Sequence, residues 1–555
     1  MLFYTQVDYK LREDIREELL RHLQEKNQII PISKSFFLLK SNEKRVSFAY
    51  DLLQENRILP QLSIDKKNNK KSEEFRQKGN EWFKNKNSKK ALECYTKSVA
   101  FAKSGSQNLA LAYANRSAVL FENGLYQECL IDINLTLKND YPERLMSKLL
   151  ARQAKATELL PSQKKVEFLT PVPSIPKKRQ NTLIQSAMDS IQIEDSKELG
   201  RHIIASKDIE PGEIIAVEDP FCQTLIAQFL THCHHCLKLC YTLIPCEMCT
   251  EAMFCSESCK LFSYESYHQF ECKILLTIQH MELMWRLVHL RITIVARSEY
   301  DKISNLVPDK EGIYRSDRYN EIHNLVANTS KRSVSDLFNR AVYAAAFFHL
   351  LRSHTCFFKT DLSEDVFKNL LLHHMQTGPC NFHEILEHPS SDKSMEGYEI
   401  GSGAYSFLSM FNHSCCPNVV RYSYGSTTVL IALETIKKGD QCFDNYGYHY
   451  AVMPKSDRQA KLQKQYLFKC SCIACTNDYP LYDNLKEIKR RELLISQKDL
   501  HSLEEGDLEK AKKIFQKTIR AIKLVENTKP NKNLAEMQEC LKQSYFIFKT
   551  INTPI

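Results

Sequence analysis

The stretch CHHCLKLCYTLIPCEMCTEAMFCSESCKLFSYESYHQFEC, residues 233–272, decides how the middle of this chain folds. A CxxC turn brings two thiolates to one zinc ion at about 2.3 Å, and tetrahedral zinc takes four such donors. Eight residues of the stretch stand at ligand-type spacings, which predicts two zinc sites: Cys233, Cys236, Cys246, Cys249, Cys255, Cys259, His268 and Cys272. The spacing alone does not determine how they pair, and Cys240 is left over.

This cysteine block is too short to bury a sizeable core, so metal binding would supply most of its folding free energy. Free buried cysteines are the alternative, and the dense, regular spacing argues against it. Four protein ligands leave zinc no open position, so we expect a structural rather than a catalytic metal.

A second cluster, Cys470-x-Cys472-x2-Cys475, offers three thiolates and is one ligand short of a closed zinc site. The candidate for the fourth ligand is Cys415, in the motif NHSCCPN of residues 412–418. The strands between these segments would have to fold back so that Cys415 lies beside the cluster. We therefore expect a third zinc ion there.

Composition excludes several functional classes. The chain has 555 residues, of which 43% are hydrophobic and 26% charged, as expected for a folded protein of several domains. It contains neither GxGxxG nor GxxxxGK[ST], so dinucleotide binding and P-loop chemistry have no support. The net charge of +9 is spread along the chain, and we expect no sequence-specific nucleic-acid binding. We also expect no signal peptide and no membrane span, and the 20 cysteines then favour the reducing cytoplasm and nucleus.

Hydrophobic periodicity and punctuation predict a multidomain α+β chain. The predicted segments are helices (1–60), helix pairs (70–160), a proline-rich linker (161–186), strands (187–232), the cysteine block (233–272), helices (273–395), strands (396–450), the second cysteine segment (451–480) and further helices (481–555).

Four motifs together resemble those of SET methyltransferases: GRHIIASKDIEPGE (200–213), NHSCCPN (412–418), DNYG (444–447) and CSCIAC (470–475). The cysteine block between the first two resembles a MYND finger, and a finger placed between two SET halves is the arrangement of the SET and MYND domain family. This resemblance implies a β-rich split SET domain with an inserted finger and a helical insert. It also implies the pairing of the ligands: Cys233, Cys236, Cys255 and Cys259 on one ion, Cys246, Cys249, His268 and Cys272 on another, and Cys415, Cys470, Cys472 and Cys475 on the third.

The same resemblance implies a protein-lysine N-methyltransferase that uses S-adenosylmethionine and acts on a lysine of a histone or another protein. Glycine would let the main chain approach the cofactor closely, and Phe468, two residues before Cys470, would stack on the adenine. The implied cofactor-binding positions are Leu199, Gly200, Arg201, Asn381, Ser409, Asn412, His413, Tyr446 and Phe468.

By the same resemblance Tyr446 is the catalytic residue and Tyr466 its partner across a lysine channel. Methyl transfer from a sulfonium requires a neutral amine held about 3 Å from the methyl group, with water excluded. A tyrosine hydroxyl can orient that amine without becoming a nucleophile. The alternative is two ordinary core tyrosines, and whether low dielectric or a water path removes the lysine proton stays open.

One residue departs from the SET pattern. Many SET domains have Gly-x-Gly where this chain has Gly200, Arg201 and His202. If the third position needs a positive φ or contact with the cofactor, a histidine would weaken binding. The alternative function is therefore a non-catalytic adaptor that binds partners through the finger and the helix pairs.

Residues 70–160 resemble a tetratricopeptide (TPR) array, whose period is 34 residues, and about three repeats are expected. Arg76 and Asn80 share one helix face, as do Arg144 and Lys148, and Asn115 lies between these pairs in the sequence. The five resemble the clamp with which TPR grooves hold the acidic C-terminus of a chaperone. An ordinary solvated face is the alternative.

Overall fold

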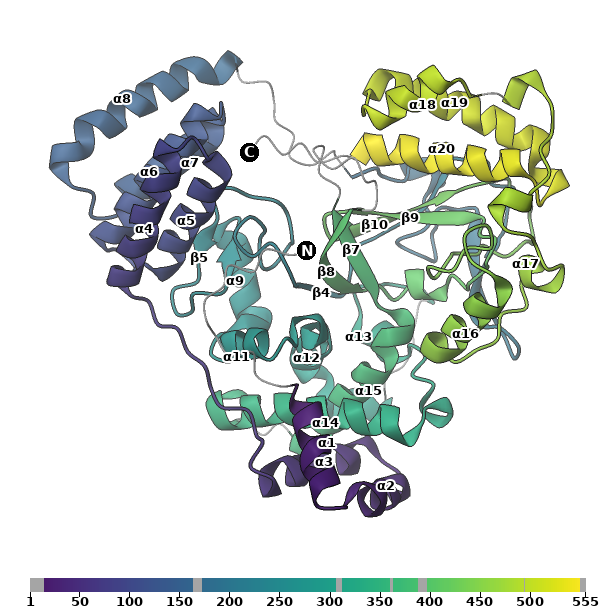
Figure 1. Cartoon of the computed structure of the whole chain (residues 1–555), viewed down its shortest axis with the longest axis horizontal. Coiled ribbons are helices and arrows are strands. Elements are labelled where there is room, and N and C mark those ends of the chain that lie inside the picture. Colours follow the sequence, from purple (N-terminus) through teal and green to yellow (C-terminus); the bar gives the residue numbers. More distant parts are fainter. Residues whose placement is uncertain are drawn as a thin grey trace.

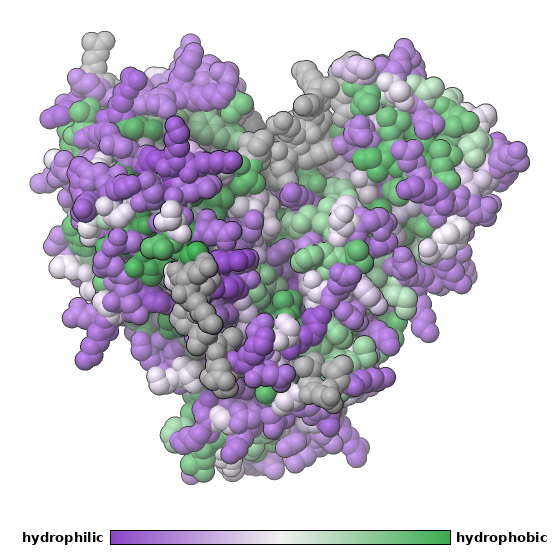
Figure 2. Space-filling model, turned by 180° about the vertical axis from the view of Figure 1, so that it is seen from behind, coloured by the Kyte–Doolittle hydropathy of each residue, from purple (hydrophilic) through white to green (hydrophobic). Residues whose placement is uncertain are grey.

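The computed structural model describes residues 14–162, 172–305, 312–359, 363–387, 397–493 and 495–549. Small β-sheets occupy the centre, and helices form two upper lobes and a base around them (Figure 1). The face shown in Figure 2 is dominated by hydrophilic side chains, with a notch between the two lobes. The mixed α+β class expected from the sequence is confirmed.

The base joins the N-terminal helices to two long helices from the middle of the sequence. The N-terminal helices α1 (Ile15–Glu25), α2 (Ile29–Leu38) and α3 (Asn42–Glu55) pack against α14 (Val334–His354) and α15 (Glu364–Asn381). Leu19 and Leu23, one helical turn apart on α1, are fully buried, as are Val46 and Leu53 on α3. Polar bonds fix the register, since the Tyr343 hydroxyl donates to Asp14 over 2.8 Å.

One upper lobe is a stack of five helices, here called the TPR-like arm: α4 (Asn69–Lys84), α5 (Ser88–Phe101), α6 (Gln107–Glu122), α7 (Tyr126–Leu137) and α8 (Glu143–Leu159). Gly79 lets α4 and α5 approach closely, because a Cβ there would lie 2.5 Å from the Tyr95 ring. The expectation of about three repeats is corrected to two helix pairs and a single closing helix. The third stretch, from Tyr141 onward, supplies only α8 before the chain leaves the lobe.

The central sheets join the two halves of the predicted SET domain. Strand β3 (Ile214–Glu218) pairs with β10 (Thr427–Ala432), which also pairs with β9 (Val419–Tyr424). Strand β4 (Cys222–Leu225) pairs with β8 (Tyr398–Ala404), and β1 (Ile191–Ser196) pairs with β2 (Gly200–Ala205). All of these pairs are antiparallel. In each of the two three-stranded sheets, strands from segments about two hundred residues apart lie side by side.

Two predicted boundaries differ from the structure. Strand β7 (His383–Glu387) lies within the stretch expected to be helical, 273–395, and it pairs with β8. The second half of the predicted linker packs into the apolar core of the strand-rich region, where Ile175 and Ile184 are buried. Of the linker 161–186, residues 163–171 lie outside the described residues.

The finger and the helical insert follow β4. The finger comprises β5 (Ile244–Pro245), β6 (Met253–Phe254), α9 (Glu257–Ser263), one π-helical turn (Tyr264–His268) and α10 (Gln269–Glu271). The insert adds α11 (Leu275–His280), α12 (Leu287–Val295) and α13 (Tyr319–His323) to α14 and α15. Short 3-10 turns connect them at Met284–Arg286, Ala296–Asn305, Thr329–Lys331 and Phe357–Lys359.

The second lobe is C-terminal. After α16 (Lys455–Tyr466) and α17 (Ile473–Thr476) come α18 (Gln497–Glu504), α19 (Leu508–Val525) and α20 (Lys532–Lys549), which lies beside β9 (Figure 1). The rings of Tyr422 and Tyr545 stack across that contact with centroids 5.6 Å apart. Among the helices of the described ranges, we find none with the length and hydropathy that a membrane crossing requires.

Candidate functional site

Three groups of four cysteine or histidine side chains come together, with the ligand atoms of each group within 4.8 Å of one another. The groups have the pairing that the family resemblance implies: Cys233, Cys236, Cys255 and Cys259; Cys246, Cys249, His268 and Cys272; and Cys415, Cys470, Cys472 and Cys475. Cys240 belongs to none of them, and its sulfur lies 3.5 Å from the Thr242 hydroxyl.

The sulfur distances fit tetrahedral zinc. Four sulfurs at about 2.3 Å from one ion are about 3.8 Å from each other. The Sγ–Sγ distance is 3.6 Å between Cys236 and Cys255, 3.8 Å between Cys246 and Cys272, and 3.6 Å between Cys415 and Cys475. The residues therefore suit zinc without rearrangement, and none of the three groups has an open position.

A buried arginine ties the finger to the SET core. Arg291 of α12 forms an ion pair with Glu271 over 2.8 Å and also bonds the His234 ring and the carbonyl oxygen of Gln223. His234, Glu271 and the ligand His268 form a fourth possible metal group. Because Arg291 already pairs with Glu271, that group is better explained as a structural network around the finger.

The two predicted catalytic tyrosines face each other, with ring centroids 4.7 Å apart. The Tyr446 hydroxyl donates to the carbonyl oxygen of Phe411 over 2.8 Å. Tyr466 is the last residue of α16, and Leu467 after it takes a left-handed conformation with φ 63° that turns the chain toward Phe468. Burial raises the pKa of both tyrosines, so both hydroxyls keep their protons at neutral pH.

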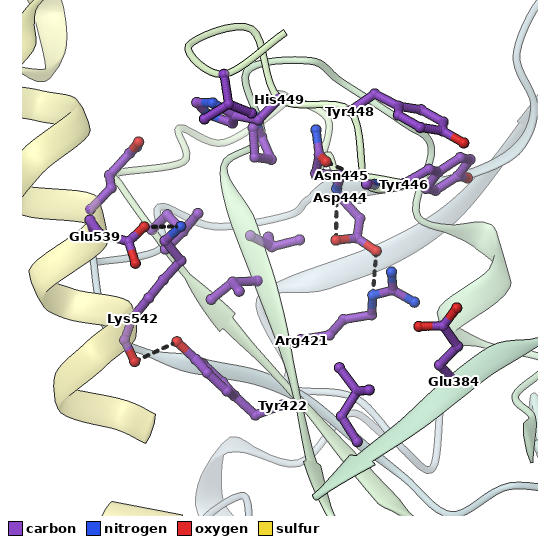
Figure 3. A pocket seen from close by; sticks show the side chains of 18 of the residues that line it. Glu384, Arg421, Tyr422, Asp444, Asn445, Tyr446, Tyr448, His449, Glu539 and Lys542 are labelled. Carbon is purple, nitrogen blue, oxygen red and sulfur yellow. Dashed lines mark hydrogen bonds and ion pairs between the residues drawn. The ribbon is translucent and has the colours of Figure 1, made fainter. Parts of the chain in front are cut away.

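A cavity of about 1110 Å³ opens beside Tyr446 and Tyr466. It lies between β9, the 444–452 loop and α20, and Figure 3 shows labelled side chains from these elements and, in Glu384, from β7. Arg421 crosses the cavity wall and pairs with Asp444 over 2.6 Å. Burial raises the pKa of Asp444, and the Arg421 guanidinium opposes that rise.

The segments expected to hold the cofactor do converge. The Asn412 amide donates to the carbonyl oxygen of Leu199 over 3.3 Å, which joins the start of the SET domain to NHSCCPN. Gly200 has φ +65°, and a Cβ there would meet open space. Arg201 instead bonds the carbonyl oxygen of Asn324 over 2.8 Å, so its side chain anchors this segment to the helical insert.

Two of the expected cofactor positions are already bonded within the chain. The Asn381 amide nitrogen donates to the carbonyl oxygens of Val326 and Thr377. The Ser409 hydroxyl contacts the carbonyl oxygens of Asn381 and Tyr405 at 2.7 and 2.5 Å. The Ser409 proton is therefore used locally, and a ligand would be met by main chain or by the Asn381 amide oxygen.

His413 and Phe468 lie at the junction between the tyrosines and the third sulfur group. The ring centroid of His413 is 5.1 Å from that of Tyr446 and 6.2 Å from that of Phe468. Burial lowers the pKa of His413 to about 4, so the ring is neutral at physiological pH. Aromatic faces, a neutral imidazole and exposed main chain are a suitable lining for an adenine nucleotide.

His202 does not strain the backbone. It stands in β2 and is not among the residues with positive φ. Its ring is buried, bonds the carbonyl oxygen of Gly200 at 2.8 Å and lies 4.0 Å from Glu194 of β1. The requirement for a glycine-like conformation therefore does not arise at this position.

The five clamp positions are only partly brought together in the TPR-like arm. The Asn80 oxygen accepts from Tyr95 and from Asn115, each over 2.8 Å, and Arg76 pairs with Glu73. Arg144 and Lys148 are exposed on α8.

Sequence reasoning missed Arg152, one turn after Lys148 on α8, which bonds the Ala114 carbonyl oxygen and the Ser117 hydroxyl at 2.8 Å. The i, i+4 spacing from Lys148 could have identified it. The Arg421–Asp444 pair was also missed, and nothing in the local sequence links these two residues.

A SET domain family model matches residues 200–447. The chain is 27% identical over 534 residues to a mouse protein named protein-lysine N-methyltransferase SMYD4, covering 72% of this chain and 66% of that protein. The zebrafish SMYD4 is 26% identical over 516 residues, covering 76% and 67%. A histone-lysine N-methyltransferase of Arabidopsis thaliana, ASHR1, is 26% identical over 280 residues, covering 50% and 53%. The chain thus spans about two thirds of the length of the SMYD4 proteins that it matches.

Proposed function

We propose that this chain, a SMYD4-like SET-domain protein, is an S-adenosylmethionine-dependent protein-lysine N-methyltransferase. The observation that carries the proposal is the convergence of three distant segments on one place. Leu199 meets Asn412, and His413 meets Tyr446, beside the cavity under α20. Each of these contacts joins residues that a methyl donor and a lysine would have to touch together.

The chain's own residues then position the reactants. S-adenosylmethionine supplies the methyl group as a sulfonium. The lysine ammonium would first give up one proton to solvent, which frees its lone pair for the methyl carbon. As that bond forms, the carbon–sulfur bond would break and its electron pair would stay on sulfur. Tyr446 and Tyr466 stay protonated, so their hydroxyls orient the amine and do not act as its base.

The three sulfur groups hold zinc in a structural role. Each has four protein ligands, which leaves no site for a substrate oxygen or water. In the third group Cys415 comes from NHSCCPN, while Cys470, Cys472 and Cys475 follow α16 and Phe468. Zinc there would fix the cofactor-binding segment relative to the Tyr466 end of α16.

Titration with S-adenosylmethionine followed by methyl transfer to a protein lysate tests the proposal. Tyr446→Phe should bind the cofactor and lose about 100-fold in transfer rate, because the amine is no longer oriented. Tyr450→Phe is the matched control, since Tyr450 is buried nearby and does not line the cavity. Cofactor binding without transfer in the wild type would favour the non-catalytic adaptor.

The second function that we propose is the binding of a protein partner by the TPR-like arm. Arg144 and Lys148 are exposed on α8, and Arg152 approaches the helix that carries Asn115. These cations suit a carboxylate-ended acidic peptide, such as the tail of a chaperone. In calorimetry the double variant Arg144→Glu/Lys148→Glu should no longer bind such a peptide. The control Lys155→Glu, on the same helix, should bind it as the wild type does. No heat with the wild type would refute this function.

A further inference from the structure

The His413 imidazole is bonded at both nitrogens, and the two bonds lead in different directions. Its Nδ1 lies 3.0 Å from the backbone nitrogen of Tyr446, and its Nε2 lies 3.4 Å from the sulfur of Cys415. The ring is 6% exposed. It therefore connects the predicted catalytic tyrosine with a ligand of the third metal group.

The two partners fix where the proton is. The backbone N–H of Tyr446 can only donate, so Nδ1 must accept and carries no proton. The single proton of the neutral ring is then on Nε2 and points to Cys415, whose thiolate accepts it. Donors of this kind around metal ligands orient the ligands and reduce their charge.

Both ends of this connection are anchored. Around the metal group, the Cys415 N–H donates to Cys472 Sγ over 3.3 Å, and the guanidinium of the fully buried Arg458 lies 3.8 Å from Cys475 Sγ. At the tyrosine end, His413 and Asp444 form a parallel bridge, and the Ser414 N–H donates to the Asp444 carbonyl oxygen over 2.8 Å. Several bonds therefore hold each end of the connection in place.

We infer that His413 is a positioning residue that couples metal occupancy at Cys415, Cys470, Cys472 and Cys475 to the placement of Tyr446 and the adjacent cofactor. The inference rests on the proposed function for the role of Tyr446, but the coupling itself is a property of binding. Coupling is reciprocal in affinity, so cofactor must tighten metal binding at this group by the same factor by which metal strengthens cofactor binding.

Zinc release to a colorimetric chelator, with and without S-adenosylhomocysteine, measures the coupling without any turnover. In the wild type the ligand should slow release of one of three zinc ions by roughly 10-fold, within the usual range of coupling free energies. Tyr446→Phe should retain this protection, because its backbone N–H still reaches His413. A wild type that binds the ligand and gains no protection overturns the inference.

Two substitutions cut the connection at opposite ends. His413→Asn keeps an oxygen near the Nδ1 position for the Tyr446 N–H and cannot reach Cys415. His413→Gln keeps an N–H near the Nε2 position for Cys415 and leaves the Tyr446 N–H without an acceptor. Both should lose most of the protection. His374→Gln is the control, since His374 is also buried and its ring contacts the Tyr319 hydroxyl at 2.9 Å.

Spectroscopy distinguishes a specific connection through His413 from a general loss of stability in the variants. In the cobalt-substituted protein, the thiolate-to-cobalt absorption should shift in His413→Asn and stay unchanged in His413→Gln. Undiminished protection in both variants, or protection that disappears only in Phe468→Ala, would assign the coupling elsewhere and overturn the inference. If the wild type binds no cofactor at all, it is the proposed function that fails.

Discussion

At the scale of single residues, Glu218 is the clearest example of an ionisable group that the fold has to accommodate. Its carboxyl group is fully buried at the end of β3, and its oxygens accept the backbone N–H groups of Phe407 and Leu408 over 3.0 and 2.8 Å. These bonds hold the start of the turn that leads to NHSCCPN. Burial nevertheless raises the pKa of Glu218 to about 8, against the opposing effect of the hydrogen bonds.

This raised pKa predicts a pH dependence of stability. The folded protein keeps a proton on Glu218 that the unfolded chain loses near pH 4.5, so the stabilisation is complete below about pH 4.5 and falls as the pH rises toward 8. Glu218→Gln does not titrate. Urea unfolding between pH 5.5 and 8 should show wild-type stability declining relative to Glu218→Gln, by an amount on the order of a few kcal/mol. Parallel curves for the two proteins would contradict this assignment.

His202 gives a second prediction at this scale, and it distinguishes the enzyme from the adaptor. Because the His202 ring is buried and its backbone is an ordinary strand, it does not block a cofactor by strain. His202→Gly should leave affinity for S-adenosylmethionine within about twofold and cost about 1 kcal/mol of stability, since glycine weakens a strand. A tenfold gain in affinity measured by calorimetry would mean that the histidine obstructs the site.

At the scale of elements, the TPR-like arm is joined to the finger by one buried arginine. Arg116 of α6 pairs with Asp132 of α7 over 2.7 Å and donates to the Leu243 carbonyl oxygen next to β5. Both side chains of the pair have no exposure. Leu239 and Tyr241 of the finger complete the apolar core of the arm.

Removing one partner of that ion pair should be much worse than removing both. Arg116→Ala leaves the Asp132 charge buried and unpaired, which typically costs about 3–5 kcal/mol. The double variant Arg116→Met/Asp132→Leu should recover most of this loss, because two apolar side chains replace two buried charges. Thermal unfolding compares the three proteins, and equal losses in the single and double variants would show that the interface with the finger dominates.

The sequence predicted some elements well and others not at all. Cys415 could be found because three thiolates leave zinc one ligand short, whereas the pairing of the finger ligands came only from family resemblance. Strand β7 was missed because it has only five residues and directly follows a long helix. Its partner β8 is separated from it in the sequence, so local periodicity does not reveal the pairing. The bond between Asn80 and Asn115 was missed because tertiary packing, which local periodicity does not describe, brings α4 and α6 together.

At the scale of the whole molecule, metal removal should affect distant parts unequally. The TPR-like arm buries an apolar core without sulfur ligands, while the finger and the segment after α16 depend on them. A strong chelator should therefore abolish cofactor binding and keep most of the helical circular dichroism. Simultaneous loss of both signals would mean that the zinc sites support the entire fold.

The base of the molecule also has a consequence for biosynthesis. Asp14, Asn42 and Ser47 bond Tyr343, Gln376 and Lys368, residues more than three hundred positions later in the chain. At about 5–20 residues per second, the ribosome takes roughly 15–60 s to supply those partners. During that interval Leu19, Phe36 and Leu53 lack the surface that buries them. We therefore expect chaperones that recognise exposed apolar helices to bind the nascent N-terminal segment.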